Sequence, residues 1–121
     1  MDENRRGFSS EDRLRKRREY LEVYDKGERL FTAHFVLYIA ENNLPYHRLG
    51  TTVSRKIGKA VIRNRIKRFL REIFRAHRES IPRHYDVVVN VRKSASTASF
   101  DELRRGFAGA IGRWRREKER C

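Results

Sequence analysis

The chain of 121 residues carries 30 Lys and Arg against 16 Asp and Glu, a formal net charge of +14. This length leaves room for one domain, residues 1–121, and the charge requires counter-ions that nucleic acid supplies more densely than an anionic membrane or an acidic protein. The longest apolar runs, such as residues 35–40 and 87–89, are far shorter than the roughly 20 residues that span a bilayer, which excludes a transmembrane helix.

The first third of the chain predicts an arm, a helix and a strand. The polar composition of residues 1–10 predicts a flexible arm, and good helix formers over residues 11–24 predict the helix. The basic cluster near its start opposes the helix dipole and favours a start later than Glu11, and Gly27 is expected to adopt the left-handed C-cap conformation. Period-two alternation over residues 29–40 predicts a strand. One face of this strand carries Phe35, Leu37 and Ile39, and the other carries His34, Val36 and Tyr38.

The middle of the chain predicts a hairpin followed by a long basic helix. Asn-Asn and Pro45 make residues 41–48 a hairpin turn, so residues 49–54 should pair antiparallel with the preceding strand. The helix should begin near residues 58–60 and end near residue 78. Most helical charge runs are solvated faces of mixed sign, but here the face opposite the apolar stripe is almost purely positive, which indicates a polyanion-binding surface. The apolar stripe consists of Ile62, Ile66, Phe69, Leu70 and Ile73, and the opposite side of Arg63, Asn64, Lys67, Arg68, Arg71 and Arg75.

The last third predicts a buried strand and a closing helix. Residues 81–83 form a turn, and the valine-rich residues 85–91 read as a strand buried on both faces. Ser99 and Glu102 fit a capping box that starts a helix, which should fray after Gly112 and leave residues 115–121 as a frayed tail. The element order α-β-β-α-β-α predicts an α+β fold with one mixed sheet, in which the basic helix is a crossover between strands.

No enzymatic constellation is recognisable in the sequence. The histidines at positions 34, 47, 77 and 84 lack the close spacing of a zinc motif, and the acidic pairs at positions 2–3 and 11–12 lie on the arm or at a helix start. Cys121 cannot form an internal disulfide, and the N-terminus lacks the apolar region of a secretion signal, so we expect a cytoplasmic protein. We expect no catalytic side chain and no metal ligand in the protein.

Residues 54–72 resemble the signature of the bacterial ribonuclease P protein subunit, which has an Arg-Asn-Arg core preceded by a Ser-Lys/Arg-Lys-x-Gly turn. The likeness covers most of the chain and continues in the first helix, in FVLYI at residues 35–39, in YDVVVNVRKSAS at residues 85–96 and in the closing helix. The residues that carry it are Ser54, Arg55, Lys56, Gly58, Arg63-Asn64-Arg65, Arg13-Leu14, Glu19-Tyr20, Val23-Tyr24 and Lys26-Gly27.

This resemblance implies a partner and a reaction. The protein would bind the catalytic RNA of ribonuclease P, and the ribonucleoprotein would remove the 5′ leader of precursor tRNA by Mg²⁺-dependent hydrolysis. The RNA would do the chemistry, with Mg²⁺ held mainly by the RNA subunit and the substrate, and neither DNA nor a membrane is expected as a partner. The resemblance also implies a left-handed crossover of the basic helix, against the usual right-handed preference.

Two surfaces follow from the resemblance, residue by residue. Single strands are held by aromatic faces on which bases stack, beside positive charges that meet phosphates. The alternative is that Tyr20 and Tyr24 only seal the first helix onto the sheet. The family commonly has Phe at these two positions, so each hydroxyl needs water or a partner here. The predicted RNA-binding set is Arg55, Lys59, Arg63, Asn64, Arg65, Lys67, Arg68 and Arg71, and the predicted leader cleft is lined by Tyr20, Tyr24, Val36, Tyr38 and Lys56.

Two other functions stay open at this point. A structural RNA-binding protein, such as a ribosomal component, would share the charge and the α+β fold but not the aromatic cleft. A duplex-DNA binder would bind random DNA as tightly as folded RNA, with an affinity that falls steeply with salt.

Overall fold

A computed structural model describes residues 13–81 and 84–120. The predicted arm over residues 1–10, the expected helix residues 11 and 12, the turn residues 82 and 83 and Cys121 lie outside the described residues. The described part holds helices α2 (Arg17–Lys26), α3 (Ala60–Ala76) and α4 (Phe100–Arg120), strands β1 (Glu28–Phe31), β2 (Phe35–Glu41), β3 (Arg48–Thr52) and β4 (Tyr85–Val91), and short 3₁₀ helices η2 (Arg55–Ile57), η3 (Arg78–Ser80) and η4 (Lys93–Thr97).

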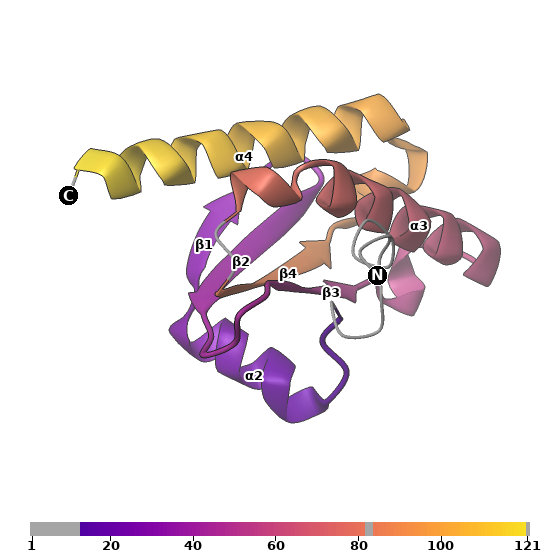
Figure 1. Cartoon of the computed structure of the whole chain (residues 1–121). Helices are drawn as coiled ribbons and strands as arrows, with labels where there is room; N and C mark the ends of the chain where they lie inside the picture. The colour runs from indigo at the N-terminus through magenta and orange to yellow at the C-terminus, as the bar shows by residue number, and fades with distance from the viewer. Residues whose placement is uncertain (1–12, 82–83, 121) are drawn as a thin grey trace, which may run out of the picture.

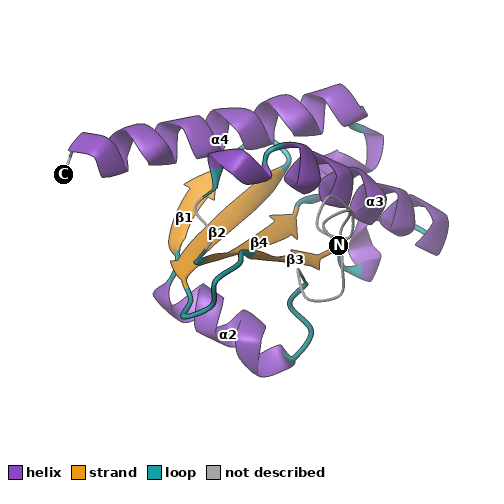
Figure 2. Cartoon of the chain, in the orientation of Figure 1, coloured by secondary structure: helices purple, strands orange, loops and turns teal. Residues whose placement is uncertain are grey.

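The strands form one mixed sheet in the order β1-β2-β4-β3. The pairs β1–β2 and β2–β4 are antiparallel, and β3–β4 is parallel. Helices α3 and α4 lie on one face of the sheet and α2 on the other (Figures 1 and 2). The predicted α+β class with one mixed sheet is therefore confirmed, and α3 is the crossover between the two parallel strands. No helix in the described part is long and apolar enough to cross a membrane.

The predicted strand over residues 29–40 is in fact two strands. The Thr32 hydroxyl accepts hydrogen bonds from the backbone N–H of Phe35 (3.1 Å) and of His34 (3.3 Å), and the Thr32 N–H donates to the Phe35 carbonyl (3.0 Å). Such a hydroxyl-to-backbone turn competes with an extended strand. The chain therefore folds back at residues 32–34, and the sheet has four strands where the sequence predicted three.

The predicted hairpin between the strands at residues 29–40 and 49–54 is wrong. β2 and β3 do not pair, because β4 lies between them. Val87, Val88 and Val89 of β4 are 0% exposed, so this strand gains most from a central place where both faces are covered. The prediction that β4 is buried on both faces is confirmed.

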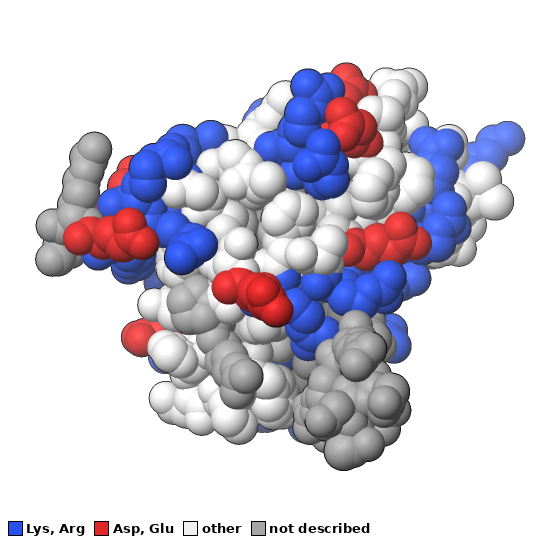
Figure 3. Space-filling view, turned by 45° about the horizontal axis from the view of Figure 1, so that its top comes forward, with Lys and Arg blue, Asp and Glu red and all other residues white. Residues whose placement is uncertain are grey.

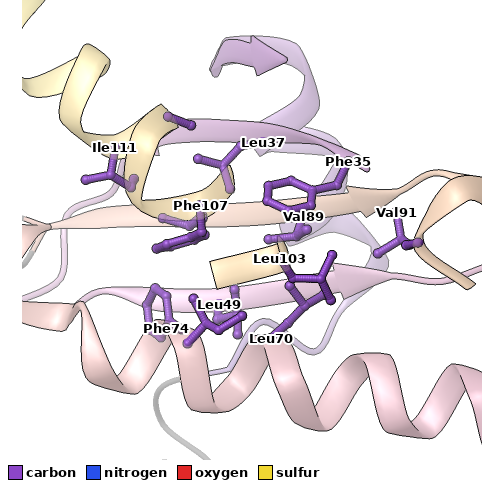
Figure 4. Close-up of a cluster of buried hydrophobic side chains, with 14 of the residues drawn as sticks. Phe35, Leu37, Leu49, Leu70, Phe74, Val89, Val91, Leu103, Phe107 and Ile111 are labelled. Atoms are coloured by element: carbon purple, nitrogen blue, oxygen red, sulfur yellow. The ribbon is translucent and has the colours of Figure 1, made fainter. Parts of the chain in front are cut away.

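Each face of the sheet has its own core. The larger one fills the space between the sheet, α3 and α4, where side chains from all these elements point toward one another (Figure 4). The smaller one lies under α2 and consists of Leu14, Val23, Ala40 and Val88, with Tyr20, Tyr24 and Tyr38 partly buried against it. The contacts of the smaller core pack α2 against the sheet.

Helix α2 begins and ends later than residues 11–24. Before it, the Leu14 N–H donates to the Leu49 carbonyl (3.0 Å), which holds this stretch along β3. At its end, Gly27 has φ −76°, so the predicted left-handed C-cap is wrong. A glycine is needed there for space, because a β-carbon would lie 2.5 Å from the Val23 carbonyl oxygen.

Helix α4 starts with the predicted capping box and runs past the predicted end. The Ser99 N–H donates to Glu102 Oε1 (2.8 Å), and the Glu102 N–H donates to Ser99 Oγ (3.1 Å). The helix continues beyond Gly112 to Arg120. Trp114 is buried and donates to Glu28 Oε1 (2.7 Å), and Lys118 reaches Glu28 Oε2 (3.3 Å). Contacts with β1 thus support the turns that follow Gly112.

Candidate nucleic-acid interface

The buried side of α3 lies close to the predicted apolar stripe. Ile66, Leu70 and Ile73 are buried, and so is Phe74, which the sequence did not place there. Ile62 and Phe69 are only partly buried against the larger core. The solvent side carries exposed Asn64, Arg68 and Arg75 and half-buried Arg71 and Lys67.

Two arginines of the predicted RNA-binding set are engaged by the protein itself. Arg63 was expected opposite the apolar stripe, which is wrong: it precedes Leu70 by seven residues, about two turns, and so lies on the same side of the helix. Its Nε donates to the Gly58 carbonyl (3.0 Å). Arg65 donates from Nη2 to the Ser96 carbonyl (3.1 Å), and its guanidinium lies 5.9 Å from the centre of the Phe69 ring. Arg63 thus connects α3 to the turn that precedes it, and Arg65 connects α3 to η4.

Positive charge concentrates at the start of α3. Arg55 and Lys56 on η2 and Lys59 at the N-cap are all exposed. The first turn has no acidic residue and no side-chain cap, so the positive end of the helix dipole and its free N–H groups add to these charges. Such an end suits a phosphate. The face that carries α3 and α4 shows Lys and Arg in several patches with fewer Asp and Glu among them (Figure 3).

Tyr20, Tyr24 and Tyr38 lie between α2 and the sheet, partly buried against the smaller core. Together with Val36, they are the residues that we call the aromatic cleft. The rings of Tyr24 and Tyr38 meet edge to face with centroids 4.8 Å apart. The Tyr24 hydroxyl hydrogen-bonds Thr52 Oγ1 (2.9 Å), so the extra oxygen relative to Phe has a partner on β3. Both rings are only partly buried, so each keeps surface for a ligand.

The ring of Tyr20 packs closely against Gly50 of β3. A β-carbon on Gly50 would lie 2.8 Å from Cε2 of the Tyr20 ring, so any other residue at position 50 would displace the ring. A glycine inside a strand signals such a close approach, and this signal was available in the sequence. Burial raises the pKa of Tyr20, a backbone hydrogen bond from Thr51 acts in the opposite direction, and the neighbouring Tyr24 raises it further. The hydroxyl therefore stays neutral.

The other two residues predicted for the leader cleft are Val36 and Lys56. Val36 is half-buried on the same face of β2 as Tyr38, two residues away. Lys56 is exposed on η2, four residues after Thr52, where the chain leaves β3 for α3. The segment that runs from β3 through η2 into α3 therefore connects the aromatic cleft with the basic start of α3.

A partly buried ion-pair network links α2 to the sheet, and sequence reasoning missed it. Arg48 donates from Nε and Nη2 to the two carboxylate oxygens of Asp86 (2.9 and 2.8 Å) and from Nη1 to Glu19 Oε2 (3.1 Å). Asp86 is 5% exposed and also accepts from the side-chain amide of Asn42. No short-range pattern signals this network, because its members come from α2, β3 and β4.

Glu19 is the member of this network that belongs to α2. Its Oε1 accepts from the backbone N–H of Arg15 (2.8 Å) and of Lys16 (3.0 Å), which satisfies donors at the helix start. Partial burial works to raise the pKa of Glu19, but these two N–H groups and the Arg48 guanidinium outweigh it and hold the pKa below its ordinary value. The hydrogen bonds that Arg48 donates to Asp86 raise the pKa of Arg48, and the negative charges of Asp86 and Glu19 raise it further.

The histidines are separate and have structural partners. His47 is buried edge to face against Phe74 (5.0 Å), His77 Nδ1 lies 2.9 Å from the Ile73 carbonyl, and His34 Nδ1 lies 2.9 Å from Ser94 Oγ. Across residues 13–81 and 84–120, no group of three or more His, Cys, Asp or Glu side chains could hold a metal ion. Exposed positive charges and partly exposed aromatic rings are the chemistry that suits an anionic ligand with unpaired bases.

Comparison with known proteins identifies relatives of the same kind in sequence and in structure. The profile of the family described as Ribonuclease P matches residues 8–115. The Ribonuclease P protein component of Desulfosudis oleivorans is 43% identical over 110 residues, which cover 91% of each chain, and that of Syntrophus aciditrophicus is 44% identical over 92 residues, covering 76% of this chain and 77% of the relative. The solved RNase P protein from Thermotoga maritima has a TM-score of 0.75 at 39% identity, covering 84% of this chain and 96% of that one. A Staphylococcus aureus RNase P protein structure has a TM-score of 0.77 at 31% identity, covering 84% and 93%.

Proposed function

The chain belongs to the family of ribonuclease P protein components, and from this premise we propose that it binds the catalytic RNA of ribonuclease P and the single-stranded 5′ leader of precursor tRNA. The ribonucleoprotein then cleaves the leader from the tRNA. The observation that carries this proposal is the aromatic cleft, whose partly exposed Tyr24 is bonded to Thr52 at the end of β3, the strand that continues through η2 into the basic start of α3.

The two surfaces suit two different RNA segments. The leader is unpaired, so its bases are free to stack on tyrosine rings while the exposed Lys56 meets phosphate. A folded RNA presents paired bases and dense phosphate, which suit the exposed charges of Arg55, Lys59 and Arg68. Because β3, η2 and α3 are consecutive, the protein would hold the leader at a set distance from the catalytic RNA.

The chemistry of cleavage belongs to the RNA in this proposal. Mg²⁺ would be held by the RNA subunit and by substrate phosphates and would supply charge stabilisation and an activated water. The residues of the protein orient the leader and increase the affinity of the holoenzyme for precursor tRNA. We also place the protein in the cytoplasm.

The proposal is tested by reconstituting the protein with the catalytic RNA at low Mg²⁺ and comparing precursor tRNAs with long and very short leaders. We expect the protein to increase the binding affinity and the cleavage rate much more for the precursor with the long leader than for the one with the short leader. Tyr38→Ala should remove most of this difference between the two precursors. The same advantage for both leaders would contradict the leader-binding role and favour a purely structural RNA-binding protein. Equal binding to random duplex DNA and to the folded RNA would instead favour a duplex-DNA binder.

A further inference from the structure

Strand β1 carries an exposed aromatic ring beside the aromatic cleft. In the antiparallel register of β1 and β2, Phe31 lies opposite Val36, and Leu30 lies opposite Leu37. Directly opposite residues share one face of a sheet. Leu30 packs with Leu37 on the larger core, so Phe31 points to the other face, which it shares with Val36 and Tyr38.

The position of Phe31 matters more than its exposure. Its side chain is 59% exposed, and the other exposed large apolar side chains in the described part are Leu21 (49%) and Val61 (78%). Single exposed apolar residues are common and need no explanation. Leu21 and Val61 are aliphatic and lie on helices, whereas Phe31 is aromatic and belongs to β1. This strand is the edge of the sheet next to β2, which carries Val36 and Tyr38 (Figure 1).

Positive charge accompanies this ring. The exposed Arg29 lies opposite Tyr38, and its guanidinium carbon is 6.0 Å from the centre of the Phe31 ring. At that distance a solvent-exposed cation–π contact is worth only about 0.5 to 1 kcal/mol, so a base could readily take the ring face. Arg113 of α4 donates to the Phe31 carbonyl (3.2 Å), which fixes the end of β1.

We propose that Phe31 is a further stacking platform, which takes an unpaired base of the precursor-tRNA leader next to the base held at Tyr24 and Tyr38. Arg29 meets a phosphate between them. Tyr38 is the diagonal neighbour of Phe31 across the two strands, a separation of about 7 to 8 Å that places the rings within reach of neighbouring nucleotides. This inference rests on the proposed function, because it names one more nucleotide subsite for the same leader.

The experiment uses the complete holoenzyme, with precursor tRNAs whose leaders lengthen one nucleotide at a time. We compare wild type with Phe31→Ala, Phe31→Leu and Phe31→Trp, and Leu21→Ala serves as the matched loss of an exposed apolar side chain. Loss of one stacked base should weaken binding of long leaders about 5- to 150-fold in Phe31→Ala. Phe31→Leu should lose as much, because it keeps apolar area but no aromatic face, while Phe31→Trp and Leu21→Ala should bind as wild type does.

A second measurement reads stacking directly. The fluorescent base 2-aminopurine is placed at each leader position in turn, and its emission falls when it stacks. We expect one position to be quenched by wild type and Phe31→Trp but not by Phe31→Ala or Phe31→Leu, and the shortest leaders should bind all variants equally.

The outcomes separate this inference from the proposed function. If wild type shows no dependence on leader length, the proposed function fails. If wild type shows that dependence and Phe31→Ala matches it at every length, only the Phe31 subsite is refuted. Equal weakening of all leaders, or a changed oligomeric state in Phe31→Ala, would also overturn it, because Phe31 would then act on assembly or contact another protein.

Discussion

Replacing Arg48 by Ala should destabilise the protein more than removing any exposed ion pair. Asp86 would remain buried, with its side chain 7% exposed, and would lose both hydrogen bonds from the guanidinium. Leaving one charge of a buried pair without its partner costs about 3 to 5 kcal/mol, and the Asn42 amide that Asp86 keeps places the expected loss near 3 kcal/mol. For a chain of this size that lowers the thermal midpoint by roughly 12 °C.

The measurement is urea or thermal unfolding followed by circular dichroism. The matched control is Arg104→Ala, because Arg104 pairs with Asp101 at 2.6 Å but both side chains are about half exposed (42% and 55%), so its loss should lower the stability much less than the loss of Arg48. The double variant Arg48→Met with Asp86→Leu should recover part of the stability, since the buried Asp86 carboxylate is then removed together with its partner.

The same substitution should also affect leader binding. Arg48 connects β3 and β4 to Glu19 at the start of α2, so its loss loosens the helix that carries Tyr20 and Tyr24. We expect the holoenzyme with Arg48→Ala to lose much of its preference for long leaders. A stability loss below about 1 kcal/mol in Arg48→Ala would refute the reasoning, because Asp86 would then have to be hydrated or readily neutralised.

Three further predictions follow from single side chains. Tyr24→Phe removes the hydroxyl bonded to Thr52 and should cost about 0.5 to 1.5 kcal/mol in urea unfolding while leader-length dependence stays, because the ring remains; loss of that dependence would contradict a stacking role. Arg68→Ala should weaken RNA binding and lower the salt slope by about one with an unchanged thermal midpoint, whereas Ile66→Ala, in the core, should cost about 2 to 5 kcal/mol; the reverse pattern would show that the faces of α3 are misassigned. The folded-state pKa of Glu19 lies below its ordinary 4.5, so the stability that ionised Glu19 contributes is present above pH 4.5 and is lost as the pH falls through the folded-state pKa. Glu19→Gln should therefore lose less stability than wild type on acidification, in unfolding curves measured over a pH series. An identical pH dependence of the two proteins would refute the role given to Glu19.

Features that depend on near neighbours in the chain were predictable. The apolar spacing of Ile66, Leu70 and Ile73 predicted the buried side of α3, and Ser99 with Glu102 predicted the start of α4. Both are set by the 3.6-residue period or by contacts within one turn, so the order of residues is enough to show them. The valines of β4 likewise signalled burial on both faces.

Strand neighbours were not predictable in this way. A turn signal at residues 41–48 suggested that β2 and β3 pair, but a hairpin is only the shortest connection, and the burial of β4 outweighs it. The bend at Thr32 depends on one hydroxyl, which accepts hydrogen bonds from two backbone N–H groups. The period-two alternation of the sequence is the same whether the chain bends there or continues as one strand. The position of Arg63 was misread, although its seven-residue distance from Leu70 was visible in the sequence.

The sequence by itself determined the α+β class, the basic start of α3 and the resemblance that names the family, because composition, periodicity and ordered motifs are properties of the chain alone. Only the tertiary structure decided how the residues of the candidate interface are placed relative to one another. Tyr24 and Tyr38 meet each other, and Tyr24 meets Thr52, across three elements, and the Arg48 network that holds α2 in place joins residues 29 and 38 positions apart. Contacts of that range depend on which strand lies beside which, and burial of the central strand β4 decides that order.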